Sequence, residues 1–189
     1  MEAFLASVGL VALAEVGDKT QLLSLALASR FRRPVPIILG ILFATLLNHA
    51  LASAVGAWLT GFLGPRLLQW ILAASFLAMA IWMLIPDKLD DTQGPGRLGV
   101  FGTTFIAFFI AEMGDKTQLA TVALAARYAE FYGVVAGTTV GMLLANVPVV
   151  IFGERISKRL PVVWVHRIAA VLFAAMGLWA AYAALSIAG

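Results

Sequence analysis

Two short polar blocks lie within otherwise apolar stretches of this 189-residue sequence. The first reads Glu-Val-Gly-Asp-Lys-Thr-Gln-Leu over residues 15–22, and the second reads Glu-Met-Gly-Asp-Lys-Thr-Gln-Leu over residues 112–119. In each block a glutamate and an aspartate are three residues apart, which places both carboxylates on one face of a helix. Carboxylate oxygens are hard ligands that suit calcium, magnesium or manganese better than copper or zinc. The blocks therefore predict a site for a divalent cation.

The predicted ligands are the carboxylates of both blocks and the side-chain carbonyls of two glutamines on the flank of the same face: Glu15, Asp18, Glu112, Asp115, Gln21 and Gln118. Lys19 and Lys116 are expected to reach the glutamate one turn earlier. Four carboxylates and two ammonium groups leave a net charge of −2, which one divalent ion or two protons neutralise. Clustered carboxylates repel one another, which favours proton binding when the metal leaves. Metal and protons would then compete for the same oxygens, as antiport requires.

Three further polar residues are expected at the depth of the blocks, namely Asn48, His49 and Asn146. The two asparagines either donate a carbonyl oxygen or orient the carboxylates, or they form hydrogen bonds between helices. His49 is either a ligand or proton relay, or a hydrogen-bonded packing residue. We assign all three to modulation of the site.

Threonine and glycine residues complete each block. In a regular helix Thr20 and Thr117 point largely away from the carboxylates, which predicts packing or capping roles near the site. Gly17 and Gly114 allow either a close approach of helices or a break that exposes backbone carbonyls. The choice between these two roles stays open at the level of sequence.

The composition indicates an all-α polytopic membrane protein. Apolar residues make up 62% and charged residues 12% of the chain, whereas soluble domains are about half apolar and a quarter charged. Apolar stretches of about 20 residues, the length that crosses a hydrocarbon core about 30 Å thick, recur along the chain. The chain has no cysteine, which excludes thiolate metal sites and cysteine nucleophiles. Basic residues lie at span ends rather than in one patch, so nucleic acid is not a predicted partner.

Proline, glycine and charged residues interrupt the apolar runs and predict six transmembrane helices. Their expected bounds are 3–29, 34–61, 65–85, 99–127, 131–153 and 161–187. The 86–98 loop, with its acidic residues and its Gly-Pro-Gly turn, divides the chain nearly in half.

The two halves are a repeat. A shift of 97 residues superimposes residues 15–82 on 112–179 without a gap and with 22 identities in 68 positions, including seven of the eight block residues. Because each unit has three spans, the second unit must enter the membrane upside down. The predicted organisation is a first three-helix repeat over 1–86, a cytoplasmic linker over 87–98 and a second, inverted three-helix repeat over 99–189. This inverted-repeat organisation is typical of secondary transporters, whose binding sites lie near the midplane where the repeats meet.

The charge distribution predicts the orientation. Loops one, three and five carry eight basic residues, whereas loops two and four carry only Arg66 and Arg127. The positive-inside rule places the basic loops in the cytoplasm and both termini outside. Each acidic or basic block residue costs roughly 2.5–3.5 kcal/mol at mid-span, so the blocks must face each other or water rather than lipid.

The duplicated Glu-x-Gly-Asp-Lys-Thr motif resembles the small cation/proton exchangers of the GDT family, which includes eukaryotic Golgi manganese and calcium transporters and bacterial manganese exporters. The motif is complete in both copies, and the likeness covers essentially the whole chain. The resemblance implies cation/proton exchange with the motif carboxylates as cation ligands. It also implies manganese as the first candidate ion, with calcium next, and the bacterial inner (cell) membrane as the location.

Two other classes of function remain as alternatives. Other inverted three-plus-three folds export small organic solutes such as amino acids, but the acidic blocks favour a cation, and no arginine within the spans is placed to bind a zwitterion's carboxylate. An intramembrane metal enzyme needs an asymmetric acid–base arrangement, whereas two copies of one motif fit alternating access better. The sequence therefore predicts a manganese/proton antiporter with no enzymatic activity and no prosthetic group. Its predicted partners are the divalent ion, protons and the lipid bilayer.

Overall fold

The computed structural model describes residues 1–85, 98–153 and 161–187, and all regular secondary structure within these ranges is helical. Among the described residues, four helices are long and apolar enough to cross a membrane, namely α3 (Pro34–Phe62), α4 (Pro65–Trp82), α7 (Phe131–Phe152) and α9 (Val162–Ser186). Their bounds confirm the helices predicted at 34–61, 65–85, 131–153 and 161–187 to within a few residues. The prediction of a solvated acidic linker at 87–98 falls almost wholly outside the described residues.

The helices predicted at 3–29 and 99–127 are each broken in two. The first consists of α1 (Glu2–Glu15) and α2 (Lys19–Phe31), and the second of α5 (Gly99–Glu112) and α6 (Lys116–Tyr128). The prediction of two unbroken helices is therefore wrong at the polar blocks themselves. Gly17 and Gly114 adopt φ values of +80° and +74°, a left-handed conformation that costs glycine little because it has no Cβ. We name residues 16–18 the first break and residues 113–115 the second break.

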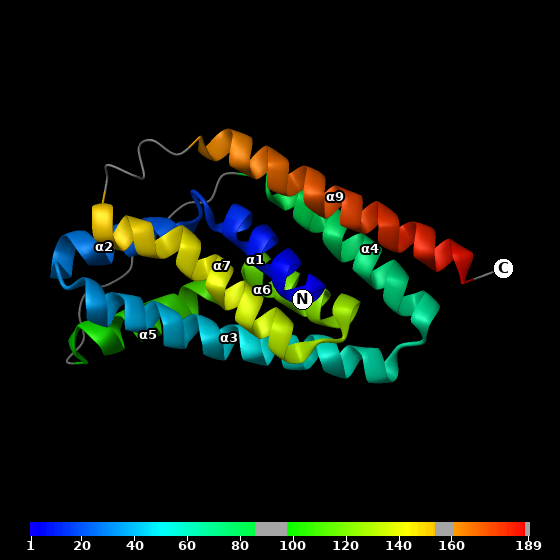
Figure 1. Ribbon diagram of the computed structural model, residues 1–189, viewed down its shortest axis with the longest axis horizontal. Helices are drawn as coiled ribbons and strands as arrows, with labels where there is room; N and C mark the ends of the chain where they lie inside the picture. Colours follow the sequence, from blue (N-terminus) through cyan, green and yellow to red (C-terminus); the bar gives the residue numbers. More distant parts are fainter. Residues whose placement is uncertain (86–97, 154–160, 188–189) are drawn as a thin grey trace.

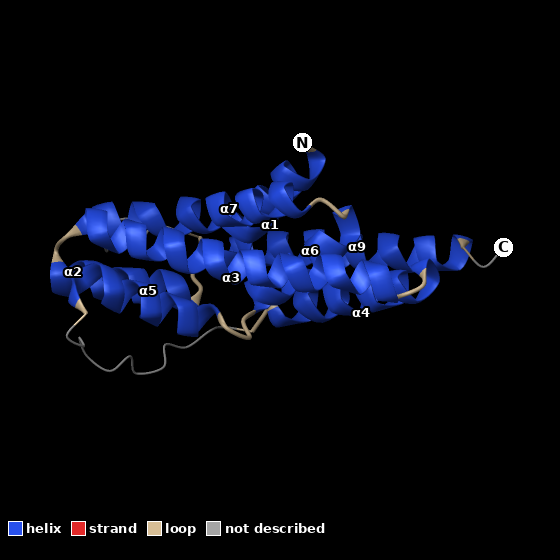
Figure 2. Cartoon of the chain, turned by 90° about the horizontal axis from the view of Figure 1, so that it is seen from below, coloured by secondary structure: helices blue, strands red, loops and turns tan. Residues whose placement is uncertain are grey.

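The helices pack in pairs that join the two halves of the sequence. α1 lies beside α7, α5 lies beside α3, and α4 lies beside α9 (Figure 1). Seen from below, α2 and α5 lie toward one end of the molecule and α4 and α9 toward the other (Figure 2). This arrangement puts one half of each broken helix, α1 and α6, between long apolar helices.

Small residues bring helices into close contact at two equivalent positions. Gly137 of α7 packs directly on the α1 backbone at Phe4, and Gly40 of α3 packs on the α5 backbone at Phe101. These two contacts are related by the 97-residue shift. A methyl group at either glycine would overlap the opposite helix, so both contacts depend on the absence of a Cβ.

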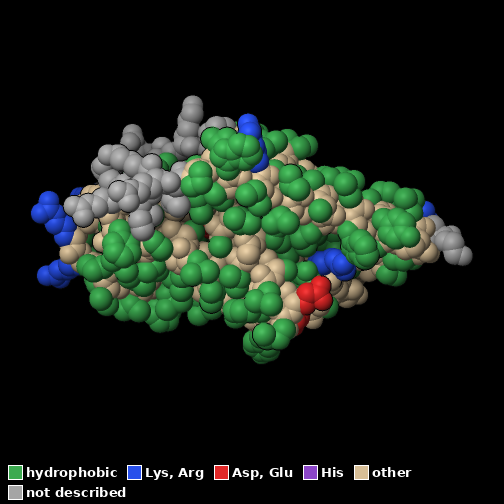
Figure 3. Space-filling model, turned by 45° about the horizontal axis from the view of Figure 1, so that its top comes forward, with side chains coloured by type: hydrophobic (Ala, Val, Ile, Leu, Met, Phe, Trp, Pro, Cys, Tyr) green, Lys and Arg blue, Asp and Glu red, His purple; other side chains and the backbone are tan. Residues whose placement is uncertain are grey.

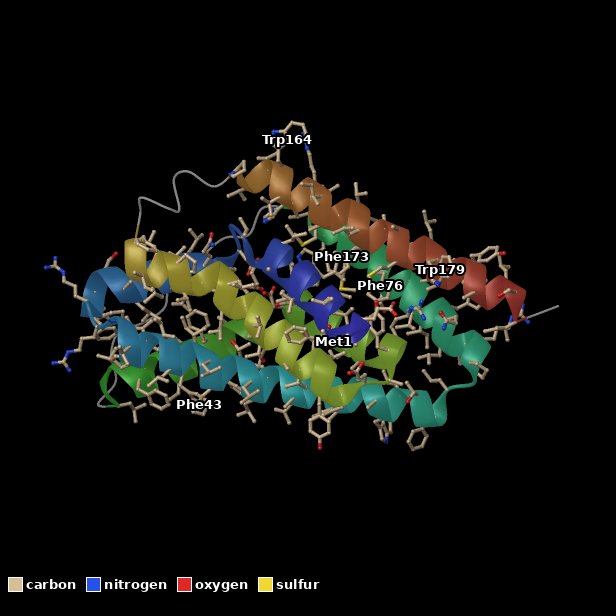
Figure 4. The ribbon with its side chains drawn as sticks, in the orientation of Figure 1. Met1, Phe43, Phe76, Trp164, Phe173 and Trp179 are labelled. Carbon is tan, nitrogen blue, oxygen red and sulfur yellow. The ribbon has the colours of Figure 1, made fainter. Side chains whose placement is uncertain are left out.

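Apolar side chains form both the core and most of the surface. Phe76 of α4 and Phe173 of α9 stack with ring centroids 6.3 Å apart (Figure 4), whereas the Trp164 and Trp179 side chains of α9 are exposed. The face drawn in Figure 3 is covered largely by hydrophobic side chains, with few charged groups. A surface of this kind suits lipid rather than water, and the chain is an integral membrane protein.

Candidate metal centre

The two breaks bring their acidic residues together. Glu15, Glu112 and Asp115 each offer one carboxylate oxygen within 4.8 Å of those of the other two, and all three side chains are buried. Two oxygens on opposite sides of one ion, with bonds of about 2.1–2.6 Å, lie roughly 4.2–5.2 Å apart. Three oxygens at this spacing can therefore share a single divalent cation. We call Glu15, Glu112 and Asp115 the carboxylate cluster.

The cluster has unused acceptor capacity. One oxygen of each of the three carboxylates is buried and accepts no hydrogen bond from the described residues. A buried carboxylate oxygen without a donor is costly, and a cation or a proton relieves that cost. The arrangement thus suits reversible binding of positive charge.

Each break places its acidic residues at helix ends. Glu15 and Glu112 end α1 and α5, while Asp18 and Asp115 are the residues before the first turns of α2 and α6. An aspartate at this position is stabilised by the partial positive charge of the helix N-terminus. The backbone of the break is held by hydrogen bonds from the aspartate N–H to the glutamate carbonyl, at 3.1 Å in the first break and 3.2 Å in the second.

The glutamine side chains close the breaks. The side-chain oxygen of Gln21 accepts a hydrogen bond from the Gly17 N–H at 2.8 Å, and that of Gln118 accepts one from the Gly114 N–H at 2.7 Å. These are the oxygens that the sequence suggested as ligands, and in this structure each accepts a hydrogen bond that stabilises a break. Their role as metal ligands stays a prediction.

The threonines contact the glutamates. The Thr20 hydroxyl donates to Glu15, and the Thr117 hydroxyl donates to Glu112. The prediction that these hydroxyls point away assumed regular helices, and it is wrong because each break turns the start of the following helix back toward the glutamate. Both threonines therefore orient a carboxylate of the cluster.

The lysines pair across the breaks rather than within one block. Lys19 Nζ lies 3.3 Å from Asp115 Oδ1, and Lys116 Nζ lies 2.5 Å from Asp18 Oδ1. The expectation that each lysine reaches the glutamate of its own block is wrong, because the helix break separates those two residues. The two pairs differ in exposure, since the Lys19 side chain is 26% exposed and that of Lys116 only 2%.

The polar residues of α3 and α7 surround the cluster. His49 Nε2 lies 3.6 Å from Glu112 Oε1, which is the one direct approach to a cluster carboxylate among these three residues. Asn48 accepts a 3.3 Å hydrogen bond from Gln118, and Asn146 accepts a 2.7 Å hydrogen bond from Ser24. Both asparagines thus form hydrogen bonds between helices, one of the two roles that the sequence left open.

Two residues at the site were missed by sequence reasoning. The Ser24 hydroxyl donates a hydrogen bond to Asn146. The 97-residue alignment already matched Ser24 with Thr121, which also carries a hydroxyl. His166 of α9 lies with its Nε2 2.6 Å from the Val16 carbonyl in the first break. Since a carbonyl only accepts, His166 Nε2–H is the donor. No local sequence pattern indicated that His166 would reach the break.

Comparisons with known proteins identify relatives of the whole chain. The model of the divalent cation/proton antiporter GDT1 family matches residues 3–91 and again residues 100–188. The chain is 52% identical over 183 residues to a Vibrio cholerae protein named "Putative manganese exporter", covering 96% of this chain and 92% of that protein. It is 28% identical over 195 residues to GDT1-like protein sll0615 of Synechocystis, covering 92% and 93% of the two chains.

A more distant relative is GDT1-like protein 3 of rice, which is 24% identical over 199 residues, covering 91% of this chain and 71% of that protein. No solved structure matches. The family match spans nearly the whole sequence and includes both polar blocks. The chain therefore belongs to the GDT1 family of divalent cation/proton antiporters.

Proposed function

We propose that this protein exports manganese in exchange for protons by alternating access, with the carboxylate cluster as the shared binding site. The observation that carries the proposal is the convergence of Glu15, Glu112 and Asp115 from two helix breaks into one buried set of oxygens. Carboxylates bind either a divalent ion or protons, so loading one ligand displaces the other. That competition couples the two fluxes.

Manganese is the proposed physiological ion because the relative with 52% identity carries that ion in its name and because oxygen ligands suit manganese. Calcium uses the same kind of ligand at longer bond lengths and is the second candidate. An amino acid substrate is disfavoured because its carboxylate would meet a cluster of like charge.

We further propose six spans arranged as two inverted repeats, with α1–α2 and α5–α6 each forming one broken span. The units are 1–86 and 99–189, joined by a cytoplasmic linker over 87–98. Support comes from the two separate matches to the family model and from contacts that recur after the 97-residue shift, such as Thr20 to Glu15 and Thr117 to Glu112. Broken helices whose ends meet the ion are a recurrent design in inverted-repeat transporters.

Purified protein in liposomes with a trapped pH-sensitive dye tests the exchange function. A manganese gradient is expected to drive proton movement in the opposite direction, and a proton gradient is expected to drive manganese uphill. Calcium and magnesium gradients, applied separately, measure selectivity. Proton movement driven by an amino acid gradient and not by any divalent ion would contradict the proposal.

Arg33 and Glu130 are equivalent in the two units and are both exposed, so they test the topology. In the cysteine-free chain, Arg33→Cys is expected to react with a membrane-impermeant maleimide only from the cytoplasmic side. Glu130→Cys is expected to react only from the outside, the side on which both termini are also proposed to lie. The measurement compares the extent of labelling in intact cells with that in inverted vesicles of the bacterial inner membrane. Labelling of both cysteines from one side would refute the inverted repeat.

The threonine hydroxyls give a second test. Thr20→Ala and Thr117→Ala are each expected to slow exchange by about tenfold, because partners that orient metal ligands contribute about 10- to 100-fold. Thr20→Ser and Thr117→Ser keep the hydroxyl and should retain most of the rate. Thr121→Ala is the matched control, since the Thr121 hydroxyl donates to the Thr117 carbonyl and not to a carboxylate. Equal rates for the alanine and serine variants would show that the hydroxyl does not matter.

A further inference from the structure

The two breaks are equivalent in sequence but are covered differently. At the first break the Val162 side chain lies against Gly17, where an added Cβ would overlap it, and His166 donates to the Val16 carbonyl at 2.6 Å. At the second break a Cβ added to Gly114 would meet open space, and Met113 is 57% exposed. Helix α9 thus covers the first break, whereas the second break is open beside Gly114.

The repeat identifies what would cover the second break. A shift of 97 residues relates Val16 to Met113, and it relates His166 of α9 to Gln69 of α4. The Gln69 side-chain oxygen is buried and accepts no hydrogen bond from the described residues, so no hydrogen bond to that oxygen holds the side chain where it now lies. Glutamine carries an N–H donor and can therefore make the same bond to a backbone carbonyl that His166 makes.

Helices α4 and α9 form a unit that can carry both side chains. Phe76 and Phe173, which are equivalent in the repeat, stack between the two helices, and Gly177 of α9 packs closely on Leu77 and the Ala73 carbonyl of α4. Contacts this close favour movement of the two helices together.

The position of this unit is asymmetric. α9 packs on α1 and α4 packs on α6, and the described residues show no comparable packing of α9 on α2 or of α4 on α5. The pair is displaced toward one end of the molecule (Figures 1 and 2). If the two repeats exchange roles, as inverted repeats permit, the same pair packs on α5 and α2 instead. That movement carries the start of α4 toward the second break as the start of α9 leaves the first.

We propose that His166 and Gln69 are alternating positioning residues: His166 fixes the Val16 carbonyl in the arrangement seen here, and Gln69 fixes the Met113 carbonyl in the opposite access state. The inference rests on the proposed exchange function, because it assigns the two arrangements to the two access states. Each bond holds the backbone next to a cluster glutamate, Glu15 in one state and Glu112 in the other. The cation would therefore meet a differently fixed half of its site on each side of the membrane.

Cysteine cross-linking detects both arrangements without measuring transport. Val16→Cys with Val162→Cys reports the arrangement seen, and Met113→Cys with Pro65→Cys, its repeat equivalent, reports the opposite one. Each cysteine pair is introduced in a separate variant and reconstituted in liposomes. On treatment with a short bifunctional thiosulfonate, both variants are expected to cross-link. Where Pro65→Cys does not insert, Leu68→Cys one turn later takes its place. Cross-linking of the first pair with none at Met113 by either partner would overturn the proposal.

Single substitutions should shift the two cross-links in opposite directions. His166→Leu is expected to slow the first cross-link and speed the second by roughly two- to tenfold, the range for one intramolecular hydrogen bond. Gln69→Leu is expected to do the reverse, and His166→Gln, which retains a donor, should restore the original balance. Val163→Leu, on the exposed side of the same turn, is the control and should change neither rate.

The outcomes separate this inference from the exchange function. A merely structural role for His166 predicts that both cross-links fall together in His166→Leu, and that result would overturn the proposal. Normal manganese/proton exchange with no cross-link to Met113 would contradict only this inference. Opposite shifts in cross-linking with no exchange activity would support the two arrangements and contradict only the transport assignment.

Discussion

Glu15→Gln and Glu112→Gln are each expected to reduce manganese/proton exchange by more than about 100-fold, while the protein still folds and inserts. Each change removes one charged ligand from a three-carboxylate cluster, and even residues that only orient metal ligands are worth about 10- to 100-fold. The amide has nearly the same shape, and it reduces charge repulsion among buried groups. Loss of activity should therefore come without loss of fold. The measurement is the initial exchange rate in liposomes, beside the thermal unfolding midpoint of each purified variant.

The matched control is Glu2→Gln, the same chemical change at an exposed residue in the first turn of α1. It should exchange at the normal rate. Because the two glutamates come from different breaks, the shared site predicts losses of similar size in both variants. Near-normal exchange in either one would mean that the cluster is not a single binding site.

The sequence predicted the parts of the fold that follow from local chemistry. Three long apolar runs that begin at Pro34, Pro65 and Pro161, and a fourth that follows Glu130, predicted helices close to their observed bounds. The duplicated block identified the acidic residues that converge, because acidic residues in apolar spans must find partners other than lipid. Gly17 and Gly114 offered a break as one of two roles, and the structure adopts it.

The details around the breaks were beyond a reading based on regular helices. A regular helix puts Lys19 one turn from Glu15 and directs Thr20 away, but the break reverses both relations. The partner of each lysine lies in the other block, about a hundred residues away in sequence, so no local spacing rule reveals it. His166 was missed for the same reason: its contact with Val16 depends on how α9 packs on α1.

The cross-pairing of the lysines also changes what removing one of them should do. Lys116 is buried and lies 2.5 Å from Asp18, whereas Lys19 is partly exposed and lies 3.3 Å from Asp115. A buried charge interacts more strongly with its neighbours than one that is screened by water. Lys116→Met should therefore have the larger effect, although the two positions are equivalent in the repeat.

Lys116→Met is expected to bind manganese at least about tenfold more tightly than the unmodified protein, or about 1.4 kcal/mol, and to exchange it more slowly. Removing the ammonium changes the charge of four carboxylates and two lysines from −2 to −3, which strengthens attraction for the ion and hinders its release. The metal-free protein should also be less stable by about 3–5 kcal/mol, the usual cost of removing one partner of a buried ion pair. Added manganese should recover much of that loss.

Manganese titration by calorimetry, exchange rates in liposomes and thermal unfolding with and without the ion measure these three effects. Lys19→Met is the matched variant and should shift each quantity in the same direction by a smaller amount, since water already screens its charge. The lysines would then act as internal counter-ions. They stabilise the metal-free cluster, and they lower its affinity for manganese so that the ion can be released. Weaker manganese binding with an unchanged exchange rate in Lys116→Met would instead make the lysine a purely structural partner of Asp18, and a charge of −2 would no longer support one manganese exchanged for two protons.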